Sequence, residues 1–174
     1  MGATEHLRVH AVEGSGRANV DTGLPVLDHL LGLLAGYGGL DLVVALAPGD
    51  AQVDVAQAAR VLGEELAGAL RADGARGYGS AVLPADEALA HVALEVSDRP
   101  LLVTNVDLTS AHVGGAASDV VAEFLRKLVE GAGITLHIRL ISGDDAQHVL
   151  EAMFKALGVA LSQARHTRTR REEA

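Results

Sequence analysis

The chain has 174 residues and a formal net charge of −9, and 49% of its residues are hydrophobic although only 2% are aromatic. We therefore expect a core of Ala, Val and Leu, and the length is sufficient to bury one. The sequence has no Cys, which excludes disulfides and thiolate metal sites. The negative charge argues against nucleic acid as a partner. No apolar run reaches the ~20 residues of a membrane span, so we expect no membrane partner and a cytoplasmic protein.

The first half of the chain predicts two strands followed by a helix, a strand and a second helix. Residues 5–20 predict a hairpin with a Gly-rich turn in its middle. Leucines at helical spacing predict a helix over about 25–36, with Pro25 in its first turn. An apolar strand is predicted at 40–46, and a long helix follows at about 52–71.

The second half predicts a similar order. Its predicted elements are strands at 80–84, 88–96 and 101–108, a helix at 118–131, a strand at 134–141 and a helix within 143–158. Hairpin strands followed by paired helices are typical of an α+β protein, with sheets covered by helices on one side.

A shift of 95 residues relates parts of the two halves and, for example, places Gln52 on Gln147. The hydrophobic pattern of helix, turn, strand, turn and helix follows the same shift. This self-similarity predicts a tandem duplication of one supersecondary unit. We therefore expect a single domain 1–174 made of two pseudo-symmetric halves, about 1–77 and 78–174.

Polar side chains form a row on the predicted helix within 143–158. Gln147 and Glu151 are four residues apart, His148 lies beside them, and Lys155 follows one turn later. Such a row suits a metal or anion site built on a rigid element. A helix with one solvated face also gives such a row, and this is the more common origin when the row is taken alone.

Seven short stretches carry the most specific signal. They are TGLPVLDHLL (22–31), YGGLDL (37–42), PADEALA (84–90), SDRP (97–100), VG (113–114), TLHI (135–138) and AQHVLEAMFKA (146–156). In this order they closely resemble the imidazoleglycerol-phosphate dehydratase family, the manganese hydro-lyases of histidine biosynthesis. The resemblance implies a fold like domain 2 of ribosomal protein S5, with a four-stranded sheet and two helices in each half. It also implies trimers that assemble into a 24-subunit shell, with metal ions at subunit contacts.

The resemblance further implies where the metal ligands would lie. The family uses two His-His-x-x-Glu motifs and one additional His for each site. The first motif falls on Gln52, Val53 and Ala56, so all of its ligands are replaced. The second falls on Gln147, His148 and Glu151, so its first His is replaced. The additional histidines, His29 and His137, are present.

Grouped as in the family, each site retains two of four ligands. One site has His137 and Glu151 with Gln147 and Val53, and the other has His29 and His148 with Gln52 and Ala56. Two protein ligands rarely hold a divalent transition metal tightly. We therefore expect no tightly bound cofactor, and Mn²⁺ at these residues if the family site persists.

Each surviving ligand also has a structural interpretation that the sequence leaves open. His29 could be a residue of a helix first turn, and His137 could be a histidine satisfied within the core. His148 and Glu151 could form a surface pair at i,i+3 spacing.

For the substrate, the resemblance assigns phosphate binding to Arg99 and Lys155. The Arg expected directly before Tyr78 is replaced by Gly77, with Arg76 one position earlier. The family's acidic residue near the N-terminus falls on Ala3, so we assign no catalytic residue. Asp86 and Glu87 match the family and are expected to cap and orient a turn.

These observations leave three functions open. The first is an imidazoleglycerol-phosphate dehydratase-like protein that forms imidazole acetol phosphate, with catalysis reduced or lost because half of the ligands are missing. The second is a non-catalytic oligomeric paralogue that acts as a scaffold or binds a small phosphorylated molecule. The third is a changed enzyme that uses Gln and His in place of the metals. A homo-oligomer, either trimers or the 24-mer, is expected throughout.

Overall fold

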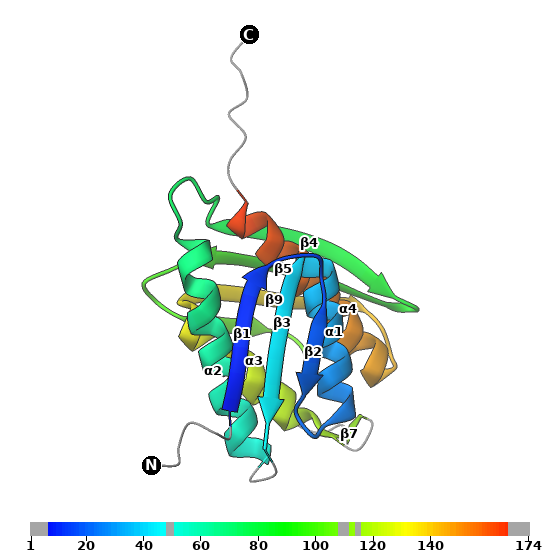
Figure 1. Ribbon diagram of the computed structural model, residues 1–174. Helices are drawn as coiled ribbons and strands as arrows, with labels where there is room; N and C mark the ends of the chain where they lie inside the picture. Colours follow the sequence, from blue (N-terminus) through cyan, green and yellow to red (C-terminus); the bar gives the residue numbers. More distant parts are fainter. Residues whose placement is uncertain (1–6, 48–50, 108–111, 114–115, 167–174) are drawn as a thin grey trace.

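The structure is a computed structural model that describes residues 7–47, 51–107, 112–113 and 116–166 (Figure 1). Its elements are β1 (Leu7–Glu13), β2 (Ala18–Asp21), α1 (Pro25–Gly38), β3 (Leu40–Leu46), α2 (Ala51–Leu70), β4 (Tyr78–Ala85), β5 (Ala88–Val96), β6 (Leu101–Thr104), β7 (His112–Val113), β8 (Ala116–Ala117), α3 (Ser118–Ala132), β9 (Ile134–Ser142) and α4 (Ala146–Arg165).

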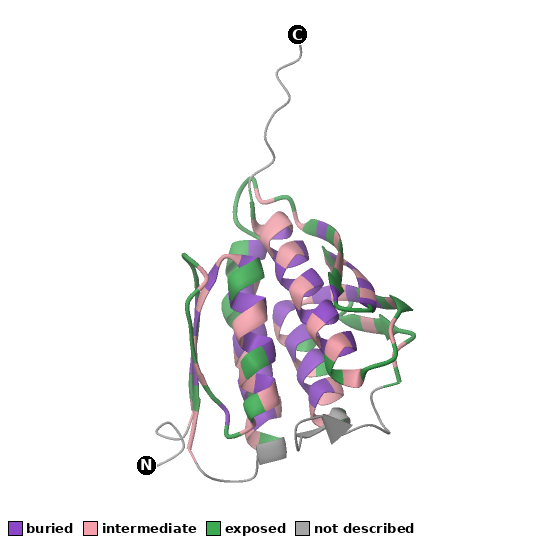
Figure 2. Ribbon diagram, turned by 90° about the vertical axis from the view of Figure 1, so that its right-hand side faces the viewer, coloured by how far each residue is buried: buried purple, intermediate pink, exposed green. Residues whose placement is uncertain are grey.

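Two sheets enclose a layer of helices, and the strands of one sheet run across those of the other (Figures 1 and 2). One sheet has the order β1-β3-β2, the other has the order β4-β5-β9-β6, and β7 pairs with β8 in a short ribbon. α1 and α2 pack on the first sheet, and α3 and α4 pack on the second. Across the middle, α1 contacts α4 and α2 contacts α3. The core therefore consists of the helix layer and the inner faces of both sheets.

The leucine stripe of α1 explains its position in this layer. Leu27, Leu30, Leu31 and Leu34 recur at helical spacing, and each is at most 1% exposed. Pro25 lies in the first turn, and the left-handed Gly39 ends the helix with φ 61°. Within the described part of the chain, no helix has the length and apolar character needed to cross a membrane.

The two halves repeat one arrangement. α2 covers residues 51–70 and α4 covers residues 146–165, so adding 95 to the bounds of α2 gives those of α4. β3 lies between an antiparallel and a parallel neighbour, and so does β9. The predicted α+β class in two halves is confirmed. We expected four strands in each half. In the described part of the chain, the first sheet has three.

The predicted hairpin over residues 5–20 is wrong. In the described residues β1 and β2 do not pair with each other, because β3 lies between them, antiparallel to β1 and parallel to β2. The segment between β1 and β2 passes over the start of β3. There the N–H of Gly14 donates to the carbonyl of Gly39 at 3.0 Å, and the carbonyl of Arg17 accepts from Leu42 at 2.9 Å. The Gly-rich turn exists, but a turn signal does not specify the partner strand.

α2 and α3 approach each other at two glycines. A Cβ on Gly131 would lie 2.1 Å from the carbonyl oxygen of Arg60, and one on Gly63 would lie 2.4 Å from that of Leu128. No side chain fits at such distances without moving a backbone. The Gly63 and Gly131 positions therefore set how closely the halves pack.

Candidate functional site

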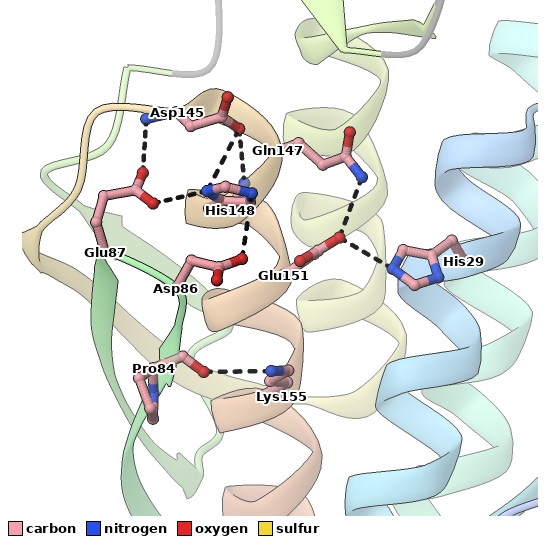
Figure 3. Close-up of polar contacts among 9 residues, drawn as sticks. All are labelled: His29, Pro84, Asp86, Glu87, Asp145, Gln147, His148, Glu151 and Lys155. Carbon is pink, nitrogen blue, oxygen red and sulfur yellow. Dashed lines mark hydrogen bonds and ion pairs between the residues drawn. The ribbon is translucent and has the colours of Figure 1, made fainter.

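The N-terminus of α4 is joined to the turn between β4 and β5 (Figure 3). Asp145 caps the helix, because its Oδ1 accepts the N–H of His148 at 3.1 Å. Glu87 reaches the same place from the turn. Its Oε1 accepts the N–H of Asp145 at 2.9 Å, and its Oε2 lies 2.6 Å from Nδ1 of His148. The turn residue Asp86 has φ 50°, a conformation that Asp tolerates better than most residues. Asp86 and Glu87 therefore orient this turn against the helix.

Carboxylates surround the ring of His148. Its Nδ1 faces Glu87, and its Nε2 lies 3.3 Å from Oδ2 of Asp86. The hydrogen bond to Glu87 is the largest cause of a raised His148 pKa, although partial desolvation opposes it. The N–H of Asp145, followed by the His148 ring, lowers the pKa of Glu87 to about 2. This environment favours the imidazolium form, in which both ring nitrogens carry protons.

A second polar cluster connects α4 to α1. Nε2 of His29 lies 3.0 Å from Oε1 of Glu151. The side-chain N–H of Gln147 donates to the same oxygen at 3.1 Å. Glu151 is the more buried partner, with 16% of its side chain exposed against 52% for His29. We call His29, Gln147 and Glu151 the Glu151 cluster. Figure 3 shows Gln147 and His29 approaching Glu151 from α4 and α1.

The loop before α1 fixes the start of that helix near His29. Asp28 accepts the N–H of Thr22 at 2.9 Å and its hydroxyl at 2.6 Å. Thr22 is buried at 5% exposure, and the contact with Asp28 is partly buried. The sequence reasoning missed this role of Asp28. The available signal was a Thr followed six residues later by an Asp in a helix first turn.

His137 lies apart from both clusters. It is on β9 opposite Ala93 of β5, on the outer face of the second sheet, whereas α4 packs on the inner face. It contributes to two adjoining cavities of about 370 and 380 Å³, which also share Ala93. Within one chain the structure therefore does not bring His137 to Glu151. It also pairs His29 with Glu151 and not with His148.

The two residues assigned to phosphate binding are also apart. Nζ of Lys155 donates to the carbonyl of Pro84 at 3.3 Å and lies 5.6 Å from the centre of the Tyr37 ring. Arg99 follows the opposite end of β5. The strand from Leu89, which pairs with Pro84, to Val96 spans about 23 Å, at roughly 3.3 Å per residue. One chain therefore does not place Arg99 and Lys155 around one phosphate.

Arg76 has a neighbour of its own. Its guanidinium carbon lies 4.2 Å from the centre of the Tyr78 ring, which is a cation–π distance. Arg76 thus covers the ring of Tyr78. In the family, the Arg expected to bind phosphate directly precedes the residue at this position.

The residues at the implied manganese positions do not fit that ion within one chain. Val53 and Ala56 supply no donor atom, and the side chain of Gln52 lies outside those described. The carboxylates around His148 favour its protonated form, which competes with a metal, and Nε2 of His29 and the side-chain N–H of Gln147 already contact Oε1 of Glu151. Among the described residues, no group of three or more His, Asp and Glu side chains is arranged to hold a metal ion.

The sequence located part of this geometry. Helical spacing places Gln147 next to Glu151, as the structure shows. The helical spacing did not show that Asp145 is the N-cap of α4. An Asp directly before the start of a helix is nevertheless a usual cap signal. The partners His29 and Glu87 come from elements 122 and 61 residues away, and no local pattern identifies them.

Comparisons with known proteins agree with the fold. The family model "Imidazoleglycerol-phosphate dehydratase" matches residues 22–161. The chain is 46% identical over 158 residues to the imidazoleglycerol-phosphate dehydratase of Desulfitobacterium hafniense, covering 88% of this chain and 80% of that protein. Its identity to the corresponding protein of Syntrophobacter fumaroxidans is 43%, with the same coverage.

Two solved structures extend this similarity to three dimensions. The crystal structure of imidazoleglycerol-phosphate dehydratase from Staphylococcus aureus has a TM-score of 0.86 and 32% identity, and the match covers 94% of this chain and 95% of that one. That of the Pyrococcus furiosus protein has a TM-score of 0.81 and 30% identity, and covers 99% and 96%. The chain therefore belongs to the imidazoleglycerol-phosphate dehydratase family.

Proposed function

We propose that this chain is an imidazoleglycerol-phosphate dehydratase-like protein in which metal-dependent dehydration is strongly reduced or lost. The observation that carries the proposal is the set of residues at the implied manganese positions, where Val53 and Ala56 supply no donor atom and Gln147 replaces one imidazole. Of the two imidazoles in the second family motif, His148 is the one that remains, and carboxylates face both of its ring nitrogens at 2.6 and 3.3 Å. A metal would have to compete for the lone pairs of His148 with protons that these carboxylates favour, which weakens coordination.

The reaction of the family explains why this loss is severe. Dehydration of imidazoleglycerol phosphate to imidazole acetol phosphate removes hydroxide from the side-chain carbon next to the ring and a poorly acidic proton from the following side-chain carbon. The imidazole ring carries the developing charge. Stabilisation of the developing charge is usually the largest contribution to such a reaction. In the part of the chain that the structure describes, no group of His, Asp and Glu side chains is arranged to hold a metal ion that would stabilise this charge, and the family's N-terminal acid falls on Ala3.

Phosphate binding would require more than one copy of the chain. Arg99 and Lys155 lie toward opposite ends of the β4–β5 hairpin, so a phosphate held by both needs residues from two subunits. We therefore extend the proposal to a homo-oligomer that binds a small phosphorylated molecule weakly. Arg99→Ala and Lys155→Ala should each weaken that binding in calorimetric titrations with imidazoleglycerol phosphate.

A non-catalytic paralogue that serves as a scaffold is the second candidate. It is favoured by apolar side chains on the outer face of the second sheet. These are Tyr78, Val82, Leu101 and Val103, which are 41–50% exposed. A single-layer sheet with such an uncovered face is suited to contact with another subunit.

The test is a turnover assay with imidazoleglycerol phosphate and added Mn²⁺, with the Desulfitobacterium hafniense relative assayed in parallel. We expect a rate below that of the relative by more than about 10⁴-fold, the upper end of the effect assigned to one general acid or base. Turnover on the order of 1 s⁻¹ or faster, within the usual range of enzymes, would contradict the proposal.

A further inference from the structure

A pocket of about 370 Å³ lies on the outer face of the second sheet, on the side away from the Glu151 cluster. Arg139 of β9 and His91 of β5 line it, and these two residues lie directly opposite each other in the sheet. Their neighbours Val92 and Ile138 are buried in the core, so the alternation along each strand directs Arg139 and His91 outward. The pocket therefore combines a guanidinium and an imidazole from neighbouring strands.

The charge of this pocket is not balanced. None of its eight lining residues is acidic, and His137, which also lines it, is a third group that can carry positive charge. In the described part of the chain Arg139 forms no ion pair with a carboxylate. Glu95 of β5 is four residues from His91, about 13 Å along the strand. Cationic groups opposite each other destabilise a sheet, so an anion between them would be stabilising.

We propose that Arg139 and His91 hold a small organic oxyanion in this pocket, either a carboxylate or a phosphate group attached to an apolar body. The site does not include Arg99 or Lys155, to which the proposed function assigns the phosphate of its ligand. Every residue of the site belongs to one chain. It is therefore expected whether or not the protein catalyses a dehydration.

Both side chains suit an oxyanion. The guanidinium of Arg139 presents N–H groups in a planar fork that matches two oxygens of a carboxylate or a phosphate. The ring of His91 is oriented by Ser80, whose Oγ lies 2.8 Å from Nε2. Nδ1 is then the ring nitrogen that remains for the anion, and it carries a proton when the Ser80 hydroxyl donates to Nε2. An N–H of His91 beside the Arg139 fork gives the anion a second donor.

The other walls favour an organic anion over a bare ion. Ala93 and Val103 contribute apolar surface, and a volume of about 370 Å³ lies in the range of small-molecule sites, roughly 300–1,000 Å³. Asn105, which follows β6, donates to the carbonyl of Leu140 at 3.1 Å and accepts the N–H of Leu140 at 2.8 Å. Asn105 thereby holds the wall formed by β6 against β9. An apolar body has room beside the charged group.

Assembly through this face would enclose the pocket. The exposed apolar side chains of the face suit contact with another subunit, but a guanidinium buried there without a counterion is costly. A bound anion would neutralise Arg139 and remove that cost. Anion binding and assembly are therefore compatible.

The experiment titrates the protein with sodium benzoate, phenyl phosphate and inorganic phosphate by calorimetry. The two organic probes share an apolar ring and differ in the charged group, so they distinguish a carboxylate site from a phosphate site. Every protein carries Arg99→Ala and Lys155→Ala, which removes the two residues assigned to phosphate elsewhere. The buffer contains none of the three anions and has low ionic strength, because salt screens exposed charges.

This parent is compared with the same protein carrying R139Q, H91Q or the control R8Q. Arg8 is also an exposed arginine on a strand, but Ala45 lies opposite it instead of an imidazole. Glutamine keeps a polar side chain and removes the charge or the ring, at positions outside the core. Circular dichroism and a melting curve establish that each variant is folded.

We expect the parent to bind one organic anion per chain, with saturation in the millimolar range or below. R139Q should weaken that binding by at least about tenfold, because charge-assisted hydrogen bonds are roughly twice as strong as neutral ones. H91Q should weaken it by a smaller factor, and R8Q should not change it. Inorganic phosphate should bind less tightly than the preferred organic anion.

No saturable binding of either organic anion at millimolar concentration, or equal affinity of the parent and folded R139Q, would overturn the inference. Equal affinity for inorganic phosphate would contradict the role of the apolar walls. Turnover of imidazoleglycerol phosphate by the wild type would instead contradict the proposed function and leave these titrations unaffected, so the two failures are distinguishable.

Discussion

Asp41 holds the segment between β1 and β2 against the start of β3. Its Oδ1 accepts the N–H groups of Ser15 and Arg17, each at 3.0 Å. A Cβ on Gly14 would lie 2.2 Å from the same carboxylate, so Gly14 leaves the space that Asp41 occupies. The N–H of Arg17 is the largest cause of a lowered Asp41 pKa. Desolvation opposes it as the next largest cause, and the N–H groups of Ser15 and Gly16 each lower the pKa by less.

This lowered pKa leads to a pH-dependent prediction. A carboxyl group whose pKa is lower in the folded chain stabilises it above the unfolded pKa, about 3.9 for Asp, and the contribution disappears as pH falls through the folded pKa. Asp41→Asn should therefore lower the melting temperature at about pH 7 and lose most of this effect toward pH 3. Asp73→Asn, in the exposed loop after α2, is the control and should have little effect at either pH. A difference between wild type and Asp41→Asn that is constant with pH would contradict the assigned role of the charge.

Single residues in the candidate site differ in how well the sequence predicts them. Gln147, His148 and Glu151 follow from helical spacing, because contacts within one helix are set by local geometry. The interpretation of His148 and Glu151 as a surface pair did not include Glu87, which lies 61 residues from His148. Such partners depend on how the β4–β5 turn docks on α4, and a local pattern contains no information about docking.

At the scale of elements, the packing of α2 on α3 distinguishes two glycines of the same helix. Gly63 faces the α3 backbone, with Leu128 O and Ala132 N at 2.4 and 2.6 Å from a built Cβ. Gly68 has open space at the same position. The sequence alone makes both of them unfavourable helix residues, because glycine costs roughly 0.5–1 kcal/mol in a helix relative to alanine.

Gly63→Ala and Gly68→Ala should therefore change stability in opposite directions. Gly63→Ala should reduce the free energy of unfolding by about 1–3 kcal/mol, since the added methyl group must displace a backbone. Gly68→Ala should raise it by about 0.5–1 kcal/mol, because the unfolded chain loses freedom at no cost in packing. Urea unfolding measures both. Equal effects of the two substitutions would show that α2 and α3 do not pack as described.

Element identity was predicted better than element pairing. The bounds of α1 and α2 follow from leucine spacing and turn residues to within a few positions. The pairing of β1 and β2 with β3 does not, because the β3 residue Asp41 receives bonds from Ser15 and Arg17 across 26 and 24 positions. The sequence pattern marks where a strand ends and does not specify which strand lies beside it.

For the whole molecule, the repeat of 95 residues relates α2 to α4, and each of these helices packs against a helix of the other half. An arginine near the C-terminal end of each of these two helices adds hydrogen bonds to the opposite half. Arg71 donates to the carbonyls of Ala132 and Gly133 at 2.7 and 2.9 Å, and Arg165 donates to that of Gly38 at 2.7 Å. Each arginine thus donates to backbone carbonyl oxygen at the end of a helix from the opposite half. The halves form one packed unit.

The outer face of the second sheet provides the prediction for assembly. Tyr78, Val82, Leu101 and Val103 leave it partly apolar, and this face carries two cavities around His137. Burial of this face between subunits should give a homo-oligomer at micromolar concentration. Light scattering measures the mass, and Val82→Asp with Val103→Asp should reduce it, whereas Val12→Asp on the first sheet serves as a matched control. A monomeric wild type would refute the assembly.

We expect this chain to retain the family fold without a tight manganese site. The most direct measurement is elemental analysis of the purified protein after dialysis, first with and then without Mn²⁺, beside the Desulfitobacterium hafniense relative. Val53, Ala56 and Gln147 stand where the family has metal ligands, so we expect no stoichiometric manganese. Retention of about one or two ions per chain, as expected of a complete donor set, would contradict the account.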